Sequence, residues 1–346
     1  KLLAIGNLKQ PVHAWGEIYT GISAKDYMDG TSNFYGVHSV TLYVDSVQVF
    51  NSTTDKVLPD ENRMINGFTD YEELTRTRRL IMRSYKLPGN RLRLLHPNEN
   101  RGAVTIDEER DYHFRYVLED NFGNRRTYQF IVKGKRQDIP EYKPEANEML
   151  YWNRTNVIQK PGMELVVPRY YVYEDVPLRT DMRGDSSHIA FDYILDAGRT
   201  PIHSYCDLSI GLRHMPVADT TKYYIVQKAG KWRSSMGGKY ANGWIKTRVR
   251  SLGTFSVDVD TIAPQITPIG QGGWRTSRNI RFRIKDMESG IGSYKVYIDG
   301  KFVLFGLKKG ILVIQNPEKV KKGVSHKLEV TVTDQCGNMA RKEYKF

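Results

Sequence analysis

Two stretches of the sequence share one pattern: Tyr116-Val-Leu-Glu-Asp-Asn-Phe-Gly-Asn124 and Val330-Thr-Val-Thr-Asp-Gln-Cys-Gly-Asn338. In each, apolar and polar residues alternate and then run into Asp-x-x-Gly-Asn. The alternation has the period of two that is typical of a half-buried β-strand. The aspartate side chain can cap the backbone of the turn, and the glycine supports a positive φ angle. The pattern therefore predicts, twice, a strand that enters a tight hairpin turn.

A second pair of matching stretches indicates that the two strands belong to copies of one domain. Gly36-Val-His-Ser-Val-Thr-Leu-Tyr-Val-Asp45 aligns with Gly290-Ile-Gly-Ser-Tyr-Lys-Val-Tyr-Ile-Asp299. This match is offset by 254 residues (290 against 36), whereas the first is offset by 214 (334 against 120). The first copy therefore carries about 40 extra residues between Phe50 and Tyr112. We expect the two copies to superpose, with Leu42 over Val296 and Tyr116 over Val330.

The extra segment contains a strong helix signal. Thr69-Asp-Tyr-Glu72 fits a capping box, and Phe68 stands where a hydrophobic residue often precedes the cap. Acidic residues come first and arginines follow, an order that suits the helix dipole. We expect a helix from about residue 70 to 84, ended by Pro88-Gly89 and additional to the shared core.

These patterns predict an all-β protein of three tandem immunoglobulin-like β-sandwich domains. The polar, proline-bearing stretch from Gly134 to Pro144 is typical of a linker, and Asp258-Val-Asp-Thr-Ile-Ala-Pro264 of a strand that passes directly into the next sandwich. The expected domains are 11–137 with a helical insertion at about 52–100, 143–260, and 261–346. The middle assignment depends on strand patterning alone.

The composition describes a globular chain with a strong positive charge. Its 346 residues carry a net charge of +13, a favourable balance for anionic partners such as acidic glycans or anionic lipid surfaces. No apolar run approaches the roughly 18 residues of a membrane-spanning helix. The two cysteines, Cys206 and Cys336, fall in different expected domains and form no disulfide framework. The chain opens at Lys1 rather than methionine, so we expect a processed or shortened form.

The best basic patch lies on the expected helix. Together with Arg78, the arginines Arg76, Arg79 and Arg83 outnumber the three acidic residues of the helix, and guanidinium groups bind carboxylates and phosphates in a bidentate manner. We predict that these three arginines form a binding site for an anionic surface or an acidic domain. An exposed helix face with internal ion pairs is the alternative.

Three other patterns could carry chemistry. His188 and Asp192, like His203 and Asp207, have the His-x-x-x-Asp spacing of some zinc sites, but no two histidines have the His-x-His spacing. A catalytic zinc needs three protein ligands, so we assign no catalytic residue and no metal or cofactor. Asp258 and Asp260, with Asp286 and Glu288, could form a calcium site at a domain joint, or serve as turn residues and solvated acids.

Aromatic residues could stack on sugar rings or fill the cores; they are Trp152, Tyr170, Tyr171, Tyr173, Trp232, Trp244 and Trp274.

Several strings resemble the region that follows the catalytic domain in M23-type (lysostaphin-like) zinc metallopeptidases of Bacteroidetes. They are Gly21-Ile-Ser-Ala-Lys-Asp-Tyr-Met-Asp-Gly30, Gly36-Val-His-Ser-Val40, Asp60-Glu-Asn-Arg-Met-Ile-Asn66, Asp70-Tyr-Glu-Glu73, Asn100-Arg-Gly-Ala103, Gly237-Gly-Lys-Tyr-Ala-Asn-Gly243 and Gly253-Thr-Phe-Ser-Val-Asp-Val-Asp-Thr-Ile-Ala-Pro264. The family's enzymes cleave peptide crosslinks in peptidoglycan with a zinc held by His-x-x-x-Asp and His-x-His. This chain lacks the second motif, so no catalytic residue carries over.

The resemblance implies a non-catalytic accessory region of a murein metallopeptidase, located in the periplasm, at the outer membrane or outside the cell. Zinc would then belong to a catalytic domain absent from this chain. The implied partners are peptidoglycan or the peptidase domain itself, with possible proximity to a membrane surface and no nucleic acid. The alternative is a stand-alone extracytoplasmic adhesion or glycan-binding protein. The presence of a peptidase domain before Lys1 would discriminate between the two.

Overall fold

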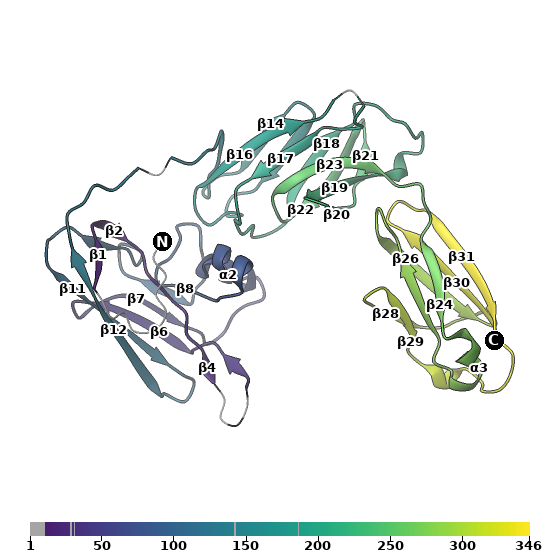
Figure 1. Ribbon diagram of the computed structural model, residues 1–346, viewed down its shortest axis with the longest axis horizontal. Helices are drawn as coiled ribbons and strands as arrows, with labels where there is room; N and C mark the ends of the chain where they lie inside the picture. Colours follow the sequence, from purple (N-terminus) through teal and green to yellow (C-terminus); the bar gives the residue numbers. More distant parts are fainter. Residues whose placement is uncertain (1–10, 28–29, 31, 142, 186) are drawn as a thin grey trace. The chain divides into compact units, whose positions relative to one another are not determined.

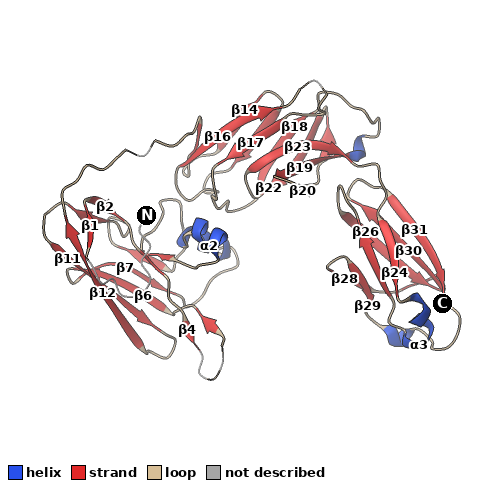
Figure 2. Cartoon of the chain, viewed as in Figure 1, coloured by secondary structure: helices blue, strands red, loops and turns tan. Residues whose placement is uncertain are grey.

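The computed structural model describes residues 11–27, 30, 32–141, 143–185 and 187–346. It is nearly all β, with tandem immunoglobulin-like sandwich domains and a small helical insertion in the first (Figures 1 and 2). Two compact units divide the chain, and their boundary runs through the second domain: unit 1 contains Lys1–Asn156, Val167–Arg179 and Ala197–Tyr205, and unit 2 contains the rest. Lys1, Met28, Asp29 and Tyr142, which belong to stretches quoted above, lie outside the described residues.

The first domain is built on a six-stranded sheet of order β1-β12-β11-β6-β7-β9. Its strands are β1 (Val12–Ala14), β6 (Ser39–Val44), β7 (Val47–Thr53), β9 (Leu95–Pro97), β11 (Asp111–Glu119) and β12 (Arg125–Gly134). Strand β6 buries every second residue, as the alternation predicts. The pair β1 and β12 is parallel, whereas β11 pairs antiparallel with both β6 and β12.

The layer that faces this sheet differs from the expected second sheet of a sandwich. It consists of two-stranded pairs and the inserted segment, with β2 (Gly16–Ile18), β3 (Gly21–Ile22), η1 (Asn62–Met64), α1 (Ile65–Phe68), α2 (Tyr71–Thr77), β8 (Met82–Arg83) and β10 (Val104–Ile106). A further pair, β4 (Asp26–Tyr27) and β5 (Phe34–Tyr35), has exposed aromatic side chains. The inserted Phe68 stacks on Phe50, with ring centroids 6.5 Å apart, in the same buried cluster as Leu42 and Tyr116. The inserted segment therefore supplies core side chains to the first domain. The helix Tyr71–Thr77, which was predicted to be additional to the core shared by the two copies, contributes no hydrophobic side chain to this buried cluster.

The predicted helix is shorter than expected and begins one residue later. Asp70, not Thr69, is the N-cap, and its side chain accepts a hydrogen bond from the backbone N–H of Glu73. The helix ends where Arg78 adopts a left-handed conformation with a φ of 65°, well before Pro88. The chain then becomes extended, because β8 pairs with β3.

The predicted repeat is visible in the strand register. Leu42 on β6 faces Tyr116 on β11, and Val296 on β26 faces Val330 on β30. Both sheets continue with the strand of the Asp-x-x-Gly-Asn hairpin, in the orders β12-β11-β6-β7 and β31-β30-β26-β27. The two copies also share the preceding hairpin turn, where Asp45 and Asp299 both have positive φ angles.

The second domain contains two antiparallel sheets of orders β13-β16-β17-β23-β19-β20 and β14-β15-β18-β22-β21. Its elements are β13 (Glu148–Leu150), β14 (Asn156–Lys160), β15 (Met163–Val167), β16 (Val176–Arg183), β17 (Asp192–Asp196), β18 (Cys206–Gly211), η2 (Thr220–Lys222), β19 (Tyr223–Ala229), β20 (Trp232–Ser235), β21 (Lys239–Ala241), β22 (Trp244–Val249) and β23 (Gly253–Val259). Alternate residues of β15 and β18 are buried, as in a sheet with one face on a core.

The third domain is a sandwich of two four-stranded sheets, β24-β25-β29-β28 and β27-β26-β30-β31. Its elements are β24 (Gln265–Ile269), η3 (Gln271–Gly273), α3 (Trp274–Ser277), β25 (Arg281–Lys285), β26 (Ile291–Ile298), β27 (Lys301–Phe302), β28 (Phe305–Lys308), β29 (Ile311–Ile314), η4 (Pro317–Lys319), β30 (Lys327–Asp334) and β31 (Met339–Lys345). Trp274 is buried in its core, where its ring contacts Phe282 edge-on.

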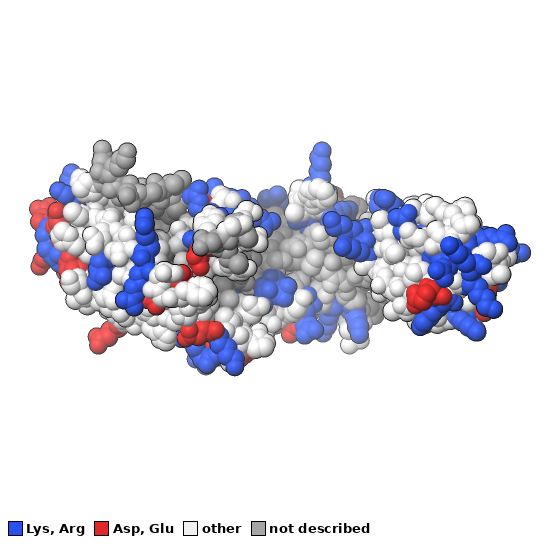
Figure 3. Space-filling model, turned by 90° about the horizontal axis from the view of Figure 1, so that it is seen from below, with Lys and Arg blue, Asp and Glu red and all other residues white. Residues whose placement is uncertain are grey.

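Positive charge is concentrated in this third domain. Residues 261–346 contain 16 lysines and arginines but only 7 aspartates and glutamates, a net charge of +9 out of +13 for the chain. Figure 3 shows lysine and arginine side chains gathered over this sandwich. A quarter of the chain therefore supplies most of its charge.

Candidate functional site at Asp260

Asp260 follows directly after β23, the last strand of the second domain, and its side chain is completely buried. Its carboxylate accepts hydrogen bonds from the backbone N–H of Ile262 (2.9 Å) and from both the N–H (3.0 Å) and the hydroxyl (2.5 Å) of Ser289. A buried carboxylate is tolerated only where such donors replace water. Ser289, itself buried, lies between β25 and β26 of the third domain, so Asp260 connects consecutive sandwiches inside unit 2.

The Asp-x-x-Gly-Asn turn of the third domain contributes the second half of the site. Asp334 at the end of β30 caps this turn by accepting hydrogen bonds from the N–H groups of Cys336 (2.9 Å) and Asn338 (2.8 Å). The Asn338 amide donates to the Asp334 carboxylate (2.8 Å), to the main-chain oxygen of Asp260 (3.0 Å) and to its carboxylate (3.3 Å). Asn338 therefore ties the turn to Asp260.

Apolar packing accompanies these hydrogen bonds. Cys336, in the middle of the turn, is buried with Tyr224 and Val226 from β19 of the second domain. The Lys222 ammonium donates to the Cys336 carbonyl at 3.0 Å. Burial raises the pKa of the Cys336 thiol to about 11, so the thiol is neutral and acts as a small apolar side chain.

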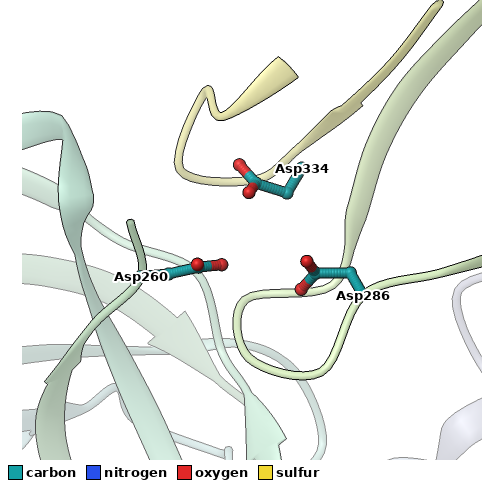
Figure 4. Close-up of side chains that lie close together, drawn as sticks. All are labelled: Asp260, Asp286 and Asp334. Carbon is teal, nitrogen blue, oxygen red and sulfur yellow. The ribbon is translucent and has the colours of Figure 1, made fainter. Parts of the chain in front are cut away.

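Asp286 brings a third carboxylate to the same place, as Figure 4 shows. It follows β25 and accepts hydrogen bonds from the N–H groups of Glu288 (3.1 Å) and Gly290 (2.7 Å). Each of Asp260, Asp286 and Asp334 offers a carboxylate oxygen, and these oxygens lie within 4.8 Å of one another. Among the described residues, no other group of three acidic, histidine or cysteine side chains meets this distance.

The electrostatics of the site follow from its burial. Burial, together with the negative charge of Asp260, raises the pKa of Asp334 despite the hydrogen bonds from Asn338. Three carboxylate oxygens are suitable ligands for a hard cation such as calcium, but calcium takes six to eight oxygens. The donors of the chain already compensate all three carboxylates, so the arrangement is above all a hydrogen-bonded link.

The structure brings together only part of the predicted acidic set. Asp260 and Asp286 meet, but Asp258 pairs with Arg233, and Glu288 accepts a hydrogen bond from Tyr224 at 3.4 Å. Asp334, Ser289 and Asn338 were missed as site residues. The repeat had marked Asp334 and Asn338 as turn residues, and nothing in the sequence showed that this turn meets Asp260.

The three predicted arginines do not form one helical patch. Arg76 on α2 pairs with the buried Glu73 at 2.6 Å, and Arg79 lies exposed beyond the end of the helix. Arg83 lies on β8, with its guanidinium 3.9 Å from the Glu174 carboxylate. The expected common helix face was wrong because the helix ends at Arg78; a role of these residues in binding stays a prediction.

In the histidine patterns, His188, Asp192 and His203 each contact another side chain of the protein, and two of the aromatic candidates fill cores. His188 lies 2.9 Å from Asp185, and Asp192 pairs with Lys228 at 2.5 Å. His203 shares a hydrogen bond of 3.0 Å with the Tyr173 hydroxyl. Of the aromatic candidates, Trp274 and Tyr173 are buried in cores, whereas Trp232 is exposed on β20.

Comparisons with known proteins give one family match and distant structural similarities. Residues 147–260 match the model of the Zu5-like domain family. No curated protein matches the chain. Similar solved structures include a Ca²⁺-stabilized adhesin with which an Antarctic bacterium binds ice, at 10% identity over 96% of this chain and 94% of that chain, with a TM-score of 0.18.

Two further structures are similar at the same level. One is SGBP-B of the Bacteroides ovatus mixed-linkage glucan utilization locus in complex with a mixed-linkage heptasaccharide, at 10% identity, 99% and 68% coverage and a TM-score of 0.17. The other is Drosophila N-cadherin EC1-4, at 10% identity, 97% and 72% coverage and a TM-score of 0.18. Scores this low support no argument about function. Within the described residues, no helix has the length and apolarity needed to cross a membrane.

Proposed function

We propose that the chain is a non-catalytic binding array that works outside the cytoplasm and attaches to a carbohydrate surface. The observation that carries the proposal is the buried link at Asp260, where Ser289 and Asn338 of the third domain bind the end of the second. Buried, fully satisfied hydrogen-bond networks rigidify the elements they join. Sandwiches linked in this way present their surfaces at a fixed spacing, which lowers the ordering cost of binding an extended partner.

Cosedimentation tests this proposal. The full chain is mixed with insoluble polysaccharides of different chemistry, among them peptidoglycan sacculi, and the pellet and soluble peptides are measured. We expect the chain to sediment with at least one polysaccharide and to release no peptide. A chain that stays in the supernatant with every polysaccharide would overturn the proposed role, and peptide release would overturn its non-catalytic character.

A second candidate function is the accessory region of an M23-type murein metallopeptidase, favoured by strings such as Gly253-Thr-Phe-Ser-Val-Asp-Val-Asp-Thr-Ile-Ala-Pro264. In that case peptidoglycan or the peptidase domain would be the partner, in the periplasm, at the outer membrane or outside the cell. Sequencing the DNA upstream of the Lys1 codon tests this candidate. An upstream reading frame in phase that encodes His-x-His supports it, and a signal peptide directly before Lys1 removes it.

A further inference from the structure

The outer face of the sheet β24-β25-β29-β28 carries a row of cations. Along β25, Phe282 and Ile284 point into the core, so Arg281, Arg283 and Lys285 alternate with them on the outside. All three are exposed. Residues two apart on a strand lie about 6.6 Å apart, so the row places three positive charges at even intervals along some 13 Å.

Neighbouring strands extend this row into a flat surface. Arg283 faces Ile311 on β29, which in turn faces the exposed Lys308 on β28, so both cations flank one aliphatic side chain. Arg281 faces Val313 in the next row. Strands two apart in a sheet are separated by about 9.6 Å. The surface thus combines a half-buried aliphatic floor with four cations around it.

These four cations form no ion pair with an acidic side chain of the described residues. Throughout the third domain, all of which the structure describes, Arg281, Arg283, Lys285 and Lys308 take part in no ion pair. The opposite sheet differs, because Glu329 on β30 binds both Lys327 (2.9 Å) and Arg341 (2.5 Å) on its outer face. Four close, unpaired cations repel one another, so the face is complementary to a partner that brings several negative charges.

We infer that this face, formed by Arg281, Arg283, Lys285 and Lys308 around Ile311 and Val313, binds an acidic polysaccharide whose charges are carboxylates. This inference rests on the proposed carbohydrate-binding function and names the ligand class. Guanidinium groups fit carboxylates in bidentate geometry, and an even row of them suits a chain with regularly repeated charges. The aliphatic floor offers contact to the C–H faces of sugar rings.

The same face is poorly suited to other polyanions. Membrane docking uses large apolar or aromatic side chains that insert below the headgroups. Single-stranded nucleic acid is bound by aromatic side chains on which bases stack. The outward positions of β25, β29 and β28 carry no exposed aromatic side chain. Leu307 on β28 is 43% exposed but pairs with the buried Leu312, so it lies on the inner side of the sheet.

Binding of the full chain to soluble polygalacturonate, a uronic acid polymer, tests the inference. Titrations at low and high salt compare the native chain with the triple variant Arg281→Gln, Arg283→Gln, Lys285→Gln. A control triple variant, Lys295→Gln, Lys342→Gln, Lys345→Gln, removes the same net charge from exposed lysines of the opposite sheet. A neutral glucan, phosphatidylglycerol vesicles and single-stranded DNA serve as competing ligands.

We expect the native chain to bind the polyuronate and the β25 variant to lose about tenfold in affinity at low salt. The control variant should lose about threefold or less, because its lysines lie on the opposite sheet and their attraction to the ligand acts over a longer distance, where salt screens it more strongly. Equal losses in the two variants, or tighter binding to vesicles or DNA than to polyuronate, overturn the inference. If the neutral glucan binds as well as the polyuronate and the β25 variant keeps that binding, the proposed function stands and the inference fails. If no polysaccharide of any kind binds, both fail.

Discussion

The turns at residues 120–124 and 334–338 have the same sequence pattern and the same internal hydrogen bonds but different surroundings. Asp120 accepts from the N–H of Asn124 at 2.9 Å and from its side-chain amide at 2.7 Å, as Asp334 does from Asn338. Gly123 and Gly337 both have positive φ angles, of 85° and 80°. Yet Phe122 is 91% exposed, whereas the equivalent Cys336 is 3% exposed.

The pKa values of the two aspartates shift in opposite directions. The side-chain amide of Asn124 lowers the pKa of Asp120, because in an exposed turn the hydrogen bond outweighs desolvation. At Asp334 desolvation and the charge of Asp260 outweigh the same hydrogen bond, and the pKa is raised. A repeated motif thus fixes the local conformation, while the residues around it decide whether it is a solvated turn or part of a site.

Removing the Asp260 side chain should have the largest effect on stability, because of the two turns only that at 334–338 makes hydrogen bonds to Asp260. In Asp260→Ala the buried N–H and hydroxyl of Ser289 lose their acceptor, and the Asn338 amide loses one of its three acceptors. These losses should cost about 3 kcal/mol of local unfolding free energy. Hydrogen exchange of amides in residues 286–290 and 334–338, measured in EDTA so that bound cations play no part, should report it. Unchanged protection there would show that the link is unimportant. Asp260→Asn, which keeps an acceptor, should lose less.

The two turn asparagines provide a direct comparison. Asn338→Ala should destabilise the third domain by about 2 kcal/mol, since the substitution removes the amide donor from the main-chain oxygen of Asp260 and from the Asp334 carboxylate, and leaves Ile262 as donor to the Asp260 oxygen that both contact. Asn124→Ala removes an exposed hydrogen bond and should change stability by less than about 0.5 kcal/mol. Denaturation followed by domain-resolved hydrogen exchange checks both. Equal effects would mean that the context of the turn does not matter.

Cys336 and Phe122, two positions after the aspartates, should also differ in how much their substitution changes stability, although by less than the asparagines. Cys336→Ser places a hydroxyl against Tyr224 and Val226 and should cost about 1 kcal/mol. Phe122→Ser should leave the stability of the first domain unchanged and raise solubility.

The Cys336 thiol, neutral and buried, should react with alkylating reagents only under denaturing conditions. Rapid labelling of the folded chain at Cys336 would contradict the buried position.

The smallest expected difference is between the pKa values of Asp120 and Asp334, and a pH titration measures it at each residue. NMR of the side-chain carboxyl carbons should place the midpoint of Asp120 below 3.8 and that of Asp334 above it. The stability contributed by Asp120 is present above pH 3.8 and lost as the pH falls through its lowered folded pKa. Asp334 has the opposite sign: the folded state binds the proton more tightly, so lowering the pH through its raised pKa towards 3.8 adds stability. Midpoints on the same side of 3.8 would refute the contrast.

The strands and turns that depend on neighbouring residues in the sequence were predicted correctly. The alternation in β6, β11 and β30 and the two Asp-x-x-Gly-Asn turns were sufficient to predict these strands and the repeat. The pairing of Leu42 with Tyr116 and of Val296 with Val330 was not predicted, because register depends on contacts between strands. The helix boundary failed because both Thr69 and Asp70 can cap a helix, and because pairing of β8 with β3 overrode the helical propensity of the residues after Arg78.

The candidate site could be predicted only in part, because it depends on contacts between residues far apart in the chain. Asp260 was found from its place before Pro264, but Ser289 and Asn338 lie 29 and 78 residues away. The cationic face was missed for a related reason. Arg281, Arg283 and Lys285 look like an ordinary polar strand edge until the register shows that uncharged residues of β24 and β29 stand beside them and that Lys308 on β28 adds a fourth cation.

Strand β1 pairs in parallel with Val132–Gly134, the last three residues of β12, and so covers part of that strand's edge. The third-domain strand equivalent to β12 is β31, and it is the last strand of its sheet. An open edge is a template for adding a strand of another molecule, which leads to aggregation. The exposed charges of Arg341, Lys342, Glu343 and Lys345 along β31 oppose such addition. The two copies thus protect this edge from intermolecular strand pairing in different ways, one with a short added strand and the other with charged side chains.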